Sequence, residues 1–197
     1  MLSVNPSVPA KTVQELVALI RANPGKYSFA TGGVGTQPHL VGEQLRLSLG
    51  LDLVHVPYTG GGLAIASLIA GHTLIGVNAV TPIMPHIKDG TLRVLAVASK
   101  TRSQSLPDVP TMAEAGYPDI EGDSWVGVLV PARTPKPIIT ALHRTIVKIL
   151  ALPDLKDLLT ALGYEVVAST PEDFAKRIRV EIETWGEVIR AANIKGL

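Results

Sequence analysis

The segment TGGVGT, residues 31–36, holds the first residues whose types and spacing could do chemistry. It lies where an apolar run, YSFAT, ends and a helical pattern begins. A junction of this kind exposes backbone N–H groups, and these groups attract anions. The pattern is typical of a nucleotide site, of a carboxylate site, or of a tight turn that binds nothing.

Neither of the common nucleotide motifs is complete at this turn. A dinucleotide-binding fold has Gly-x-Gly-x-x-Gly after a strand, but here Gly33 and Gly35 are followed by Pro38 in the third position. A P-loop has Gly-Lys-Ser/Thr after its glycines, and that sequence is missing. These two departures argue against nucleotide binding.

Catalytic and metal-binding patterns are equally incomplete. The GDSW segment around Ser124 resembles the Gly-Asp-Ser of certain lipases, and a serine nucleophile needs a histidine and an acid. The one Asp-x-x-His, Asp52 to His55, precedes the serine and has the wrong order for those enzymes. The five histidines show neither His-x-His nor His-x-x-x-His spacing, and the chain has no cysteine. We therefore expect no enzyme activity, no catalytic residue, no metal and no cofactor.

The composition is that of an ordinary globular protein. Of the 197 residues, 46% are hydrophobic and 18% are charged, and the formal net charge is +1. A nucleic-acid-binding protein usually shows a basic excess, so no nucleic-acid partner is expected. No apolar run is long enough to span a membrane, and the N-terminus does not have the pattern of a signal peptide.

Strand and helix patterns alternate through the first part of the chain, which predicts an α/β fold with a largely parallel sheet. The strands expected there are 27–31, 51–58, 73–79 and 91–99. After Gly122 helices prevail, with strands expected at 124–132 and 164–168 and helices at 136–151, 153–162 and 171–192. The last of these helices carries an apolar stripe at helical spacing, for which core packing is the favoured explanation. The change near Gly122 is a candidate lobe boundary.

Three loops follow successive predicted strands: residues 31–36, residues 57–62 and Asn78. In an open α/β sheet the carboxyl ends of the strands face the ligand crevice. All three loops are neutral and rich in N–H and hydroxyl donors, which suit a carboxylate. Glycines that only form tight turns explain each loop separately, but the three together favour a binding site without catalysis.

Several long segments show a resemblance to a known family. They include SFATGGVGTQPHLVGEQL, LVHVPYTGGG, SWVGVLVPARTPKPII and STPEDFAKRI. In this order they resemble the solute receptors of tripartite tricarboxylate transporters, the Bug or TctC type of periplasmic binding proteins. The resemblance extends over essentially the whole chain.

This resemblance implies a periplasmic-binding-protein type II-like α/β fold, with one complete lobe and the C-terminal part of the other. Residues 1–4 would be a remnant of the first crossover strand, and residues 5–122 would form the second, ligand-binding lobe. Residues 123–197 would supply the returning hinge strand and the C-terminal helices of the incomplete first lobe. Family members carry a signal peptide and most of a first lobe before the point that corresponds to Met1, so we expect the chain to be N-terminally truncated.

The resemblance also implies a set of ligand-binding residues. The first loop would donate to a ligand carboxylate, the second would line the same cleft, and an aromatic residue of the hinge strand would face the ligand or pack in the hinge. The residues at these places are Gly33, Gly35, Thr36, Gln37, Tyr58, Thr59, Gly60 and Trp125. Asn78 stands where the family commonly has Asp, which removes a negative charge and weakens any preference for an amino group.

The implied function is that of a periplasmic receptor that captures a small organic carboxylate for the membrane subunits of its transporter. Loss of part of the first lobe would leave apolar surface on the C-terminal helices, so a homo-oligomer is expected. An alternative stays open: the shortened chain acts as a self-associating structural or interaction module and binds no solute.

Overall fold

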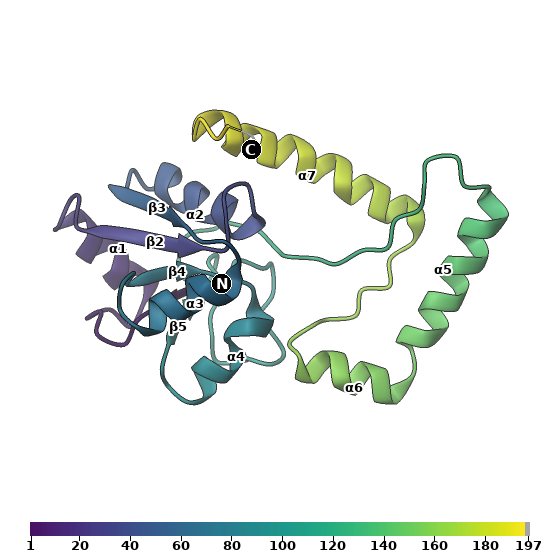
Figure 1. Ribbon diagram of the computed structural model, residues 1–197, viewed down its shortest axis with the longest axis horizontal. Coiled ribbons are helices and arrows are strands. Elements are labelled where there is room, and N and C mark those ends of the chain that lie inside the picture. The colour runs from purple at the N-terminus through teal and green to yellow at the C-terminus, as the bar shows by residue number, and fades with distance from the viewer. Residues whose placement is uncertain (196–197) are drawn as a thin grey trace.

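A computed structural model describes residues 1–195 (Figure 1). Five strands and seven helices are described. The strands are β1 (Leu2–Val4), β2 (Tyr27–Thr31), β3 (Leu53–Pro57), β4 (Ile75–Val77) and β5 (Arg93–Ala96). The helices are α1 (Val13–Arg21), α2 (Gln37–Ser48), α3 (Gly61–Ile69), α4 (Val80–Lys88), α5 (Lys136–Leu150), α6 (Pro153–Ala161) and α7 (Pro171–Ala191).

The strands form one sheet in the order β3-β2-β4-β1-β5. β2 is parallel to β3 and to β4, whereas β1 is antiparallel to its two neighbours, β4 and β5. Four strands therefore share one direction, and the prediction of a largely parallel α/β sheet is confirmed. Leu2–Val4 is a buried strand inside this sheet. The lobe boundaries expected at residues 4 and 122 stay predictions.

The core lies between the sheet and the helices that cover it. Thr12 caps the N-terminus of α1, since its side chain accepts the Glu15 N–H, and α1 buries Val13, Leu16, Val17 and Ile20 at helical spacing. α2 approaches β2 closely, since a Cβ at Gly42 would overlap the ring of buried Phe29. This close packing sets where the N-terminus of α2 lies relative to the strand ends.

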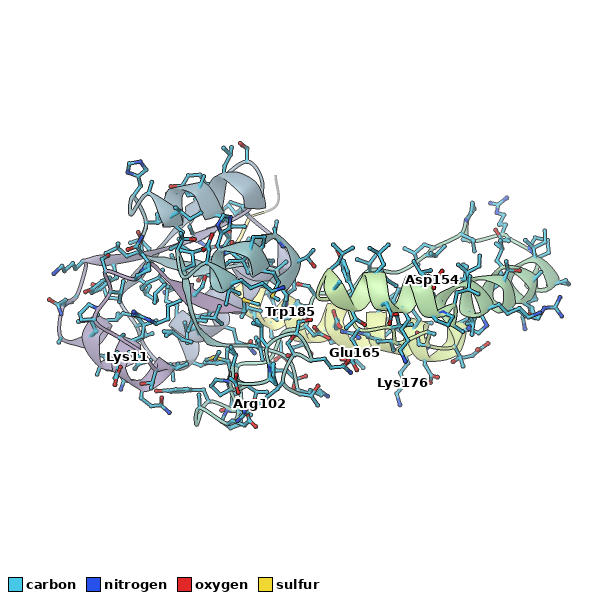
Figure 2. All side chains as sticks on the ribbon, turned by 90° about the horizontal axis from the view of Figure 1, so that it is seen from below. Lys11, Arg102, Asp154, Glu165, Lys176 and Trp185 are labelled. Atoms are coloured by element: carbon cyan, nitrogen blue, oxygen red, sulfur yellow. The ribbon has the colours of Figure 1, made fainter. Side chains whose placement is uncertain are left out.

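The part of the chain after residue 122 has a different character. None of α5, α6 and α7 has a buried residue. Figure 1 shows α5 and α6 lying away from the sheet and α7 running back toward it, with long stretches of chain before α5 and between α6 and α7. In Figure 2 Trp185 lies beside the sheet-containing body, whereas Asp154 and Lys176 lie on the extension. Among the described residues, α7 touches the body mainly through α2.

The strands predicted at 124–132 and 164–168, including the returning hinge strand, are not formed. Val126 and Leu129 are 83% and 72% exposed. A strand requires the backbone of a neighbour to complete its hydrogen bonds, and these segments pair with no strand in the described part of the chain. The apolar pattern of these segments suits a strand, but the prediction that they form strands is wrong.

No helix within residues 1–195 has the length and apolar character needed to cross a membrane.

Candidate ligand-binding site

The loops after β2 and β3 lie at the same edge of the sheet. Because these strands are parallel, their carboxyl ends, Thr31 and Pro57, open side by side. The Tyr58 N–H donates to the Thr31 carbonyl at 3.0 Å, and the Gly60 N–H donates to the Gly32 carbonyl at 3.0 Å. The two predicted loops are thus joined by backbone hydrogen bonds.

Gly32 allows this contact, and the sequence reasoning did not single it out. A Cβ at position 32 would lie 2.8 Å from the Gly61 nitrogen and 3.1 Å from its Cα. Both neighbouring atoms belong to the backbone, so they cannot move aside as a flexible side chain would. Two glycine runs at the ends of successive strands were the signal that could have predicted this close approach.

Residues 33–36 form a tight turn at the start of α2. The Thr36 hydroxyl donates to the Gly33 carbonyl at 2.8 Å, and the Thr36 N–H reaches the same oxygen at 3.4 Å. Gly35, the third residue of the turn, has a φ of 74°, as a type II turn requires. Within residues 1–195 we find no acceptor for the N–H groups of Val34 and Gln37. These two donors are therefore free to bind an anion.

Beside this turn lies an open cleft of about 390 Å³. Gly35, Gln37 and Leu40 line it on the side of α2, and Asp123, Ser124, Trp125, Glu181 and Trp185 line it on the other side. The structure therefore brings three predicted site residues together here, namely Gly35, Gln37 and Trp125. Trp185 and Ile182 belong to the apolar stripe of α7. The explanation of this stripe as core packing is wrong for Ile182, which is 68% exposed.

Polar contacts hold the far wall of the cleft. The Ser124 hydroxyl donates to Gln37 Oε1 at 2.8 Å, so this serine contacts an amide and not a histidine. The Trp125 Nε1–H donates to Glu181 Oε2 at 2.8 Å. Arg177 lies 2.8 Å from Glu181 and 3.5 Å from Asp123, and so it partly neutralises the two carboxylates. The Gln37 Nε2 is buried without an acceptor in the described residues.

The other predicted residues lie outside this cleft. The Tyr58 hydroxyl is 2.5 Å from the Ser67 hydroxyl of α3. Gly60, with a φ of 119°, is the residue before α3, and Thr59 beside it is exposed. Asn78 is 4% exposed, and its Nδ2 has no acceptor among residues 1–195. Their roles in binding stay predictions.

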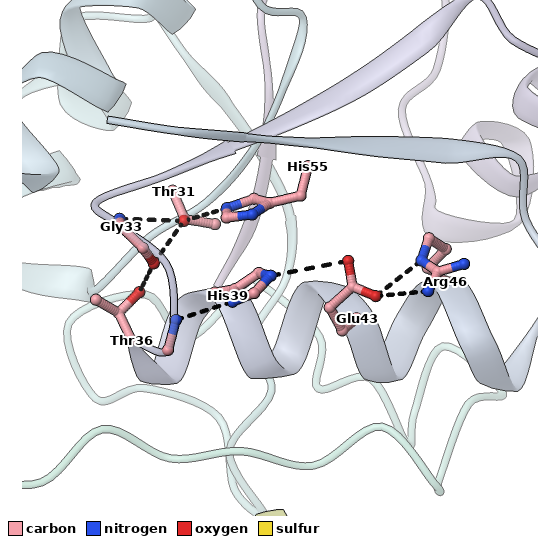
Figure 3. A network of polar contacts seen from close by, with 8 residues as sticks. Thr31, Gly33, Thr36, His39, Glu43, Arg46 and His55 are labelled. Carbon is pink, nitrogen blue, oxygen red and sulfur yellow. Dashed lines mark hydrogen bonds and ion pairs between the residues drawn. The ribbon is translucent and has the colours of Figure 1, made fainter. Parts of the chain in front are cut away.

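A network of polar side chains lies beneath the glycine turn (Figure 3). The Gly35 N–H donates to His39 Nδ1 at 3.0 Å, and the His39 ring stacks on the His55 ring with 3.8 Å between centroids. His55 Nε2 lies 2.6 Å from the Thr31 hydroxyl, which in turn accepts the Gly33 N–H at 3.3 Å. Sequence reasoning missed this network because it joins residues of two strands and a helix.

Burial lowers the pKa of both histidines. The pKa of His55 falls from 6.5 to about 4, first through burial and then through the charge of His39. The pKa of His39 also falls through burial, which outweighs the opposing effect of Glu43. Both rings are therefore neutral at pH 7, and a neutral His39 can accept the Gly35 N–H.

No group of three or more metal-ligating side chains comes together within residues 1–195.

N–H donors without an acceptor in residues 1–195, at the carboxyl ends of parallel strands and beside an open cleft, are an arrangement typical of α/β proteins of the ligand-binding class. Residues 1–194 match the family model of the tripartite tricarboxylate transporter family receptor, TctC. The chain belongs to this family.

Individual relatives agree with this assignment. Protein BugT of Bordetella pertussis is 34% identical over 195 residues, which cover 99% of this chain and 60% of BugT. The structure of Rpa4515 from R. palustris with adipate has a TM-score of 0.90 at 30% identity and covers 100% of this chain and 66% of that one. MatC from Rhodopseudomonas palustris, with bound malate, has a TM-score of 0.82 at 26% identity, over 96% of this chain and 65% of that one. The chain thus spans about two thirds or less of the length of these relatives. The TM-scores show that it has the type II-like α/β fold of periplasmic binding proteins.

Proposed function

We propose that this chain belongs to a periplasmic receptor that captures a small organic carboxylate for the membrane subunits of a tripartite tricarboxylate transporter. One observation carries the proposal: the backbone N–H groups of Val34 and Gln37, which have no acceptor within residues 1–195, lie at a helix N-terminus beside an open cleft. Backbone N–H groups in this setting bind a carboxylate without a lysine or arginine.

The charges around the cleft support one orientation of the ligand. Asp123 and Glu181 line the wall opposite the glycine turn, and Arg177 neutralises them only in part. A ligand carboxylate is therefore repelled from that wall and attracted to the N-terminus of α2. In this proposal Gln37 and Trp125 contact the ligand directly, and Gly33, Gly35 and Thr36 shape the turn.

The second loop has a supporting part in the same proposal. Tyr58 and Gly60 hydrogen-bond to the backbone of the strand end and of the first loop, and Thr59 is exposed between them. Asn78 would reach the ligand through its Nδ2, which has no acceptor in the described part of the chain and, as a donor, suits an oxygen of the ligand. Adipate and malate are the natural probes because they are bound in the two related structures.

Isothermal titration calorimetry tests the proposal directly. We expect a 1:1 interaction with adipate or malate, which weakens in Thr36→Ala because that variant loses the hydroxyl contact that closes the turn. Thr145→Ala is a matched control, since its hydroxyl only bonds the preceding turn of α5. Absence of binding to every di- and tricarboxylate tested would refute the proposed activity of this chain.

A second candidate function is self-association as an interaction module. It is favoured by the apolar side chains that α5, α6 and α7 leave exposed, such as Ile138, Leu158 and Ile182. Light scattering after size-exclusion chromatography distinguishes the two candidates. A stable dimer that binds no carboxylate supports the function as an interaction module, and a monomer that binds carboxylates excludes it.

A further inference from the structure

We propose that His39 is the positioning residue of the glycine turn, and that its neutral imidazole holds the peptide between Val34 and Gly35 in the orientation that leaves the Val34 and Gln37 donors free. This inference rests on the proposed function for its consequence in ligand binding. The hydrogen-bond geometry on which it stands is independent of any ligand.

The first step concerns the turn itself. Residues 33–36 have the pattern of a type II turn, which differs from a type I turn mainly by a flip of its central peptide. That peptide carries the Gly35 N–H, and the structure aims this N–H at His39 Nδ1 at 3.0 Å. As long as Nδ1 is an acceptor, the hydrogen bond opposes the flip.

The second step concerns how His39 is held. Its side chain is 5% exposed, and its ring stacks on His55 of β3. His55 is in turn fixed by the Thr31 hydroxyl at 2.6 Å and by the ring of Phe29, whose centroid is 4.9 Å away. The acceptor therefore has a fixed position, which a positioning residue requires.

The third step concerns the charges that face this imidazole. On its own helix Glu43 Oε1 lies 3.9 Å from His39 Nε2, and Arg46 binds the other oxygen of that carboxylate at 2.7 Å. From β3 the only titratable neighbour is His55, and β2 contributes Thr31 and Phe29, which carry no charge. The charged residues that line the cleft, Asp123 and Glu181, each pair with Arg177. They face the side of α2 that carries Gln37, which lies about 200° around the helix from His39.

A proton on His39 Nδ1 would place two N–H donors against each other. The Gly35 N–H would then turn away, and the Val34 carbonyl would turn toward the imidazolium to accept its proton. Burial also disfavours a charge on His39, since it lowers the pKa of this imidazole in spite of the opposing effect of Glu43. The turn is therefore held in the observed form while His39 is neutral and is released when His39 is protonated.

Nuclear magnetic resonance of the ligand-free chain tests the positioning itself. At pH 7.5 we expect His39 to carry its proton on Nε2, and we expect the Gly35 amide resonance to shift in step with the titration of His39. In His39→Asn, whose Oδ1 can accept at the same place without titrating, the Gly35 amide should not respond to pH in that range. A proton on Nδ1 at pH 7.5, or a Gly35 amide resonance that does not shift while His39 titrates, would overturn the proposal.

Calorimetry with adipate tests the consequence for binding. His39→Phe keeps a ring on His55 but has no acceptor, and we expect it to weaken adipate binding about five- to tenfold at pH 7.5, the value of one hydrogen bond. His39→Asn should recover most of this loss, and its affinity should decline less than that of the wild type as the pH falls to 5.5. Because adipate titrates equally in all samples, variants are compared at each pH.

The two arms separate the possible failures. If the wild type binds no adipate or malate, the proposed function is refuted, and the resonance experiment alone decides whether His39 positions the turn. If the wild type binds and His39→Phe binds equally well with the same pH profile, the positioning role is refuted and the receptor function stands.

Discussion

The stacked histidines make the stability of this protein depend on pH between 4 and 7. For a histidine whose pKa is lower in the folded chain, the unfolded chain binds more protons between the two pKa values. The free energy of unfolding therefore rises with pH in that interval. The contribution of His55 is complete near pH 7, and it is lost as the pH falls toward 4.

The size of this effect follows from the pKa of His55, which burial lowers from 6.5 to about 4. The full difference corresponds to about 3 kcal/mol, because each pKa unit is worth about 1.4 kcal/mol. About 2 kcal/mol of it is lost already at pH 5, where the unfolded imidazole is mostly protonated and the folded one is not. Partial exposure of the ring to solvent makes both figures upper bounds.

Urea unfolding at pH 7.5, 6 and 5 measures this loss. In His55→Phe the ring still stacks on His39 but cannot titrate, so its free energy of unfolding should fall less between pH 7.5 and 5 than that of the wild type. Loss of the contact with Thr31 lowers its stability equally at each pH and does not alter the slope. His72→Gln, which removes an exposed imidazole outside this network, is the matched control. Equal slopes for the wild type and His55→Phe would refute the reasoning.

Three further changes probe the packing and the walls of the cleft. Gly42→Ala should destabilise the fold by about 1–3 kcal/mol because its Cβ overlaps the Phe29 ring. Gly62→Ala, whose Cβ faces open space in α3, should be neutral or stabilising by up to about 1 kcal/mol. Urea unfolding that finds Gly62→Ala less stable than Gly42→Ala would contradict this prediction. Gly32→Ala should weaken adipate binding at least tenfold because its Cβ forces the two loops apart. The Cβ of Gly61→Ala points into open space, so this variant should keep the wild-type affinity. Equal affinities of the two variants in calorimetry would contradict a role of the loop contact in binding. Trp125→Phe removes the donor to Glu181 and should cost about 1 kcal/mol of binding free energy, so an unchanged adipate affinity would show that this hydrogen bond does not contribute to binding.

The sequence predicts the sheet-forming half of this fold because the signals there are local. Apolar runs that end in glycine turns become strands: β2 is mostly buried, and β3, at the edge of the sheet, leaves Val54 exposed. α1 buries its apolar residues at the spacing that its pattern indicates. Residues 124–132 have the same apolar character and form no strand, because a strand also depends on a neighbour that its own residues cannot specify.

The site divides in the same way. The glycine turn was predictable, since a positive φ at Gly35 is a local requirement. The stack of His39 on His55 was not, because it depends on how α2 lies over β3. Gly32 is intermediate: its residue type was visible, but its purpose appears only when the second loop is placed against it.

The two walls of the cleft differ in how firmly they are held, and this difference bears on binding. The wall of the glycine turn rests on buried groups, with Thr31 fully buried and His39 nearly so. The opposite wall is held by exposed hydrogen bonds, such as Ser124 to Gln37, each worth about 1 kcal/mol. The wall formed by residues 123–125 should therefore open locally more often than the wall of the glycine turn. Changes at the turn should then alter the strength of the ligand contacts, whereas changes at residues 123–125 should alter how often the opposite wall is in place. The observed affinity depends on both, because the fraction of molecules with the wall in place multiplies the intrinsic affinity.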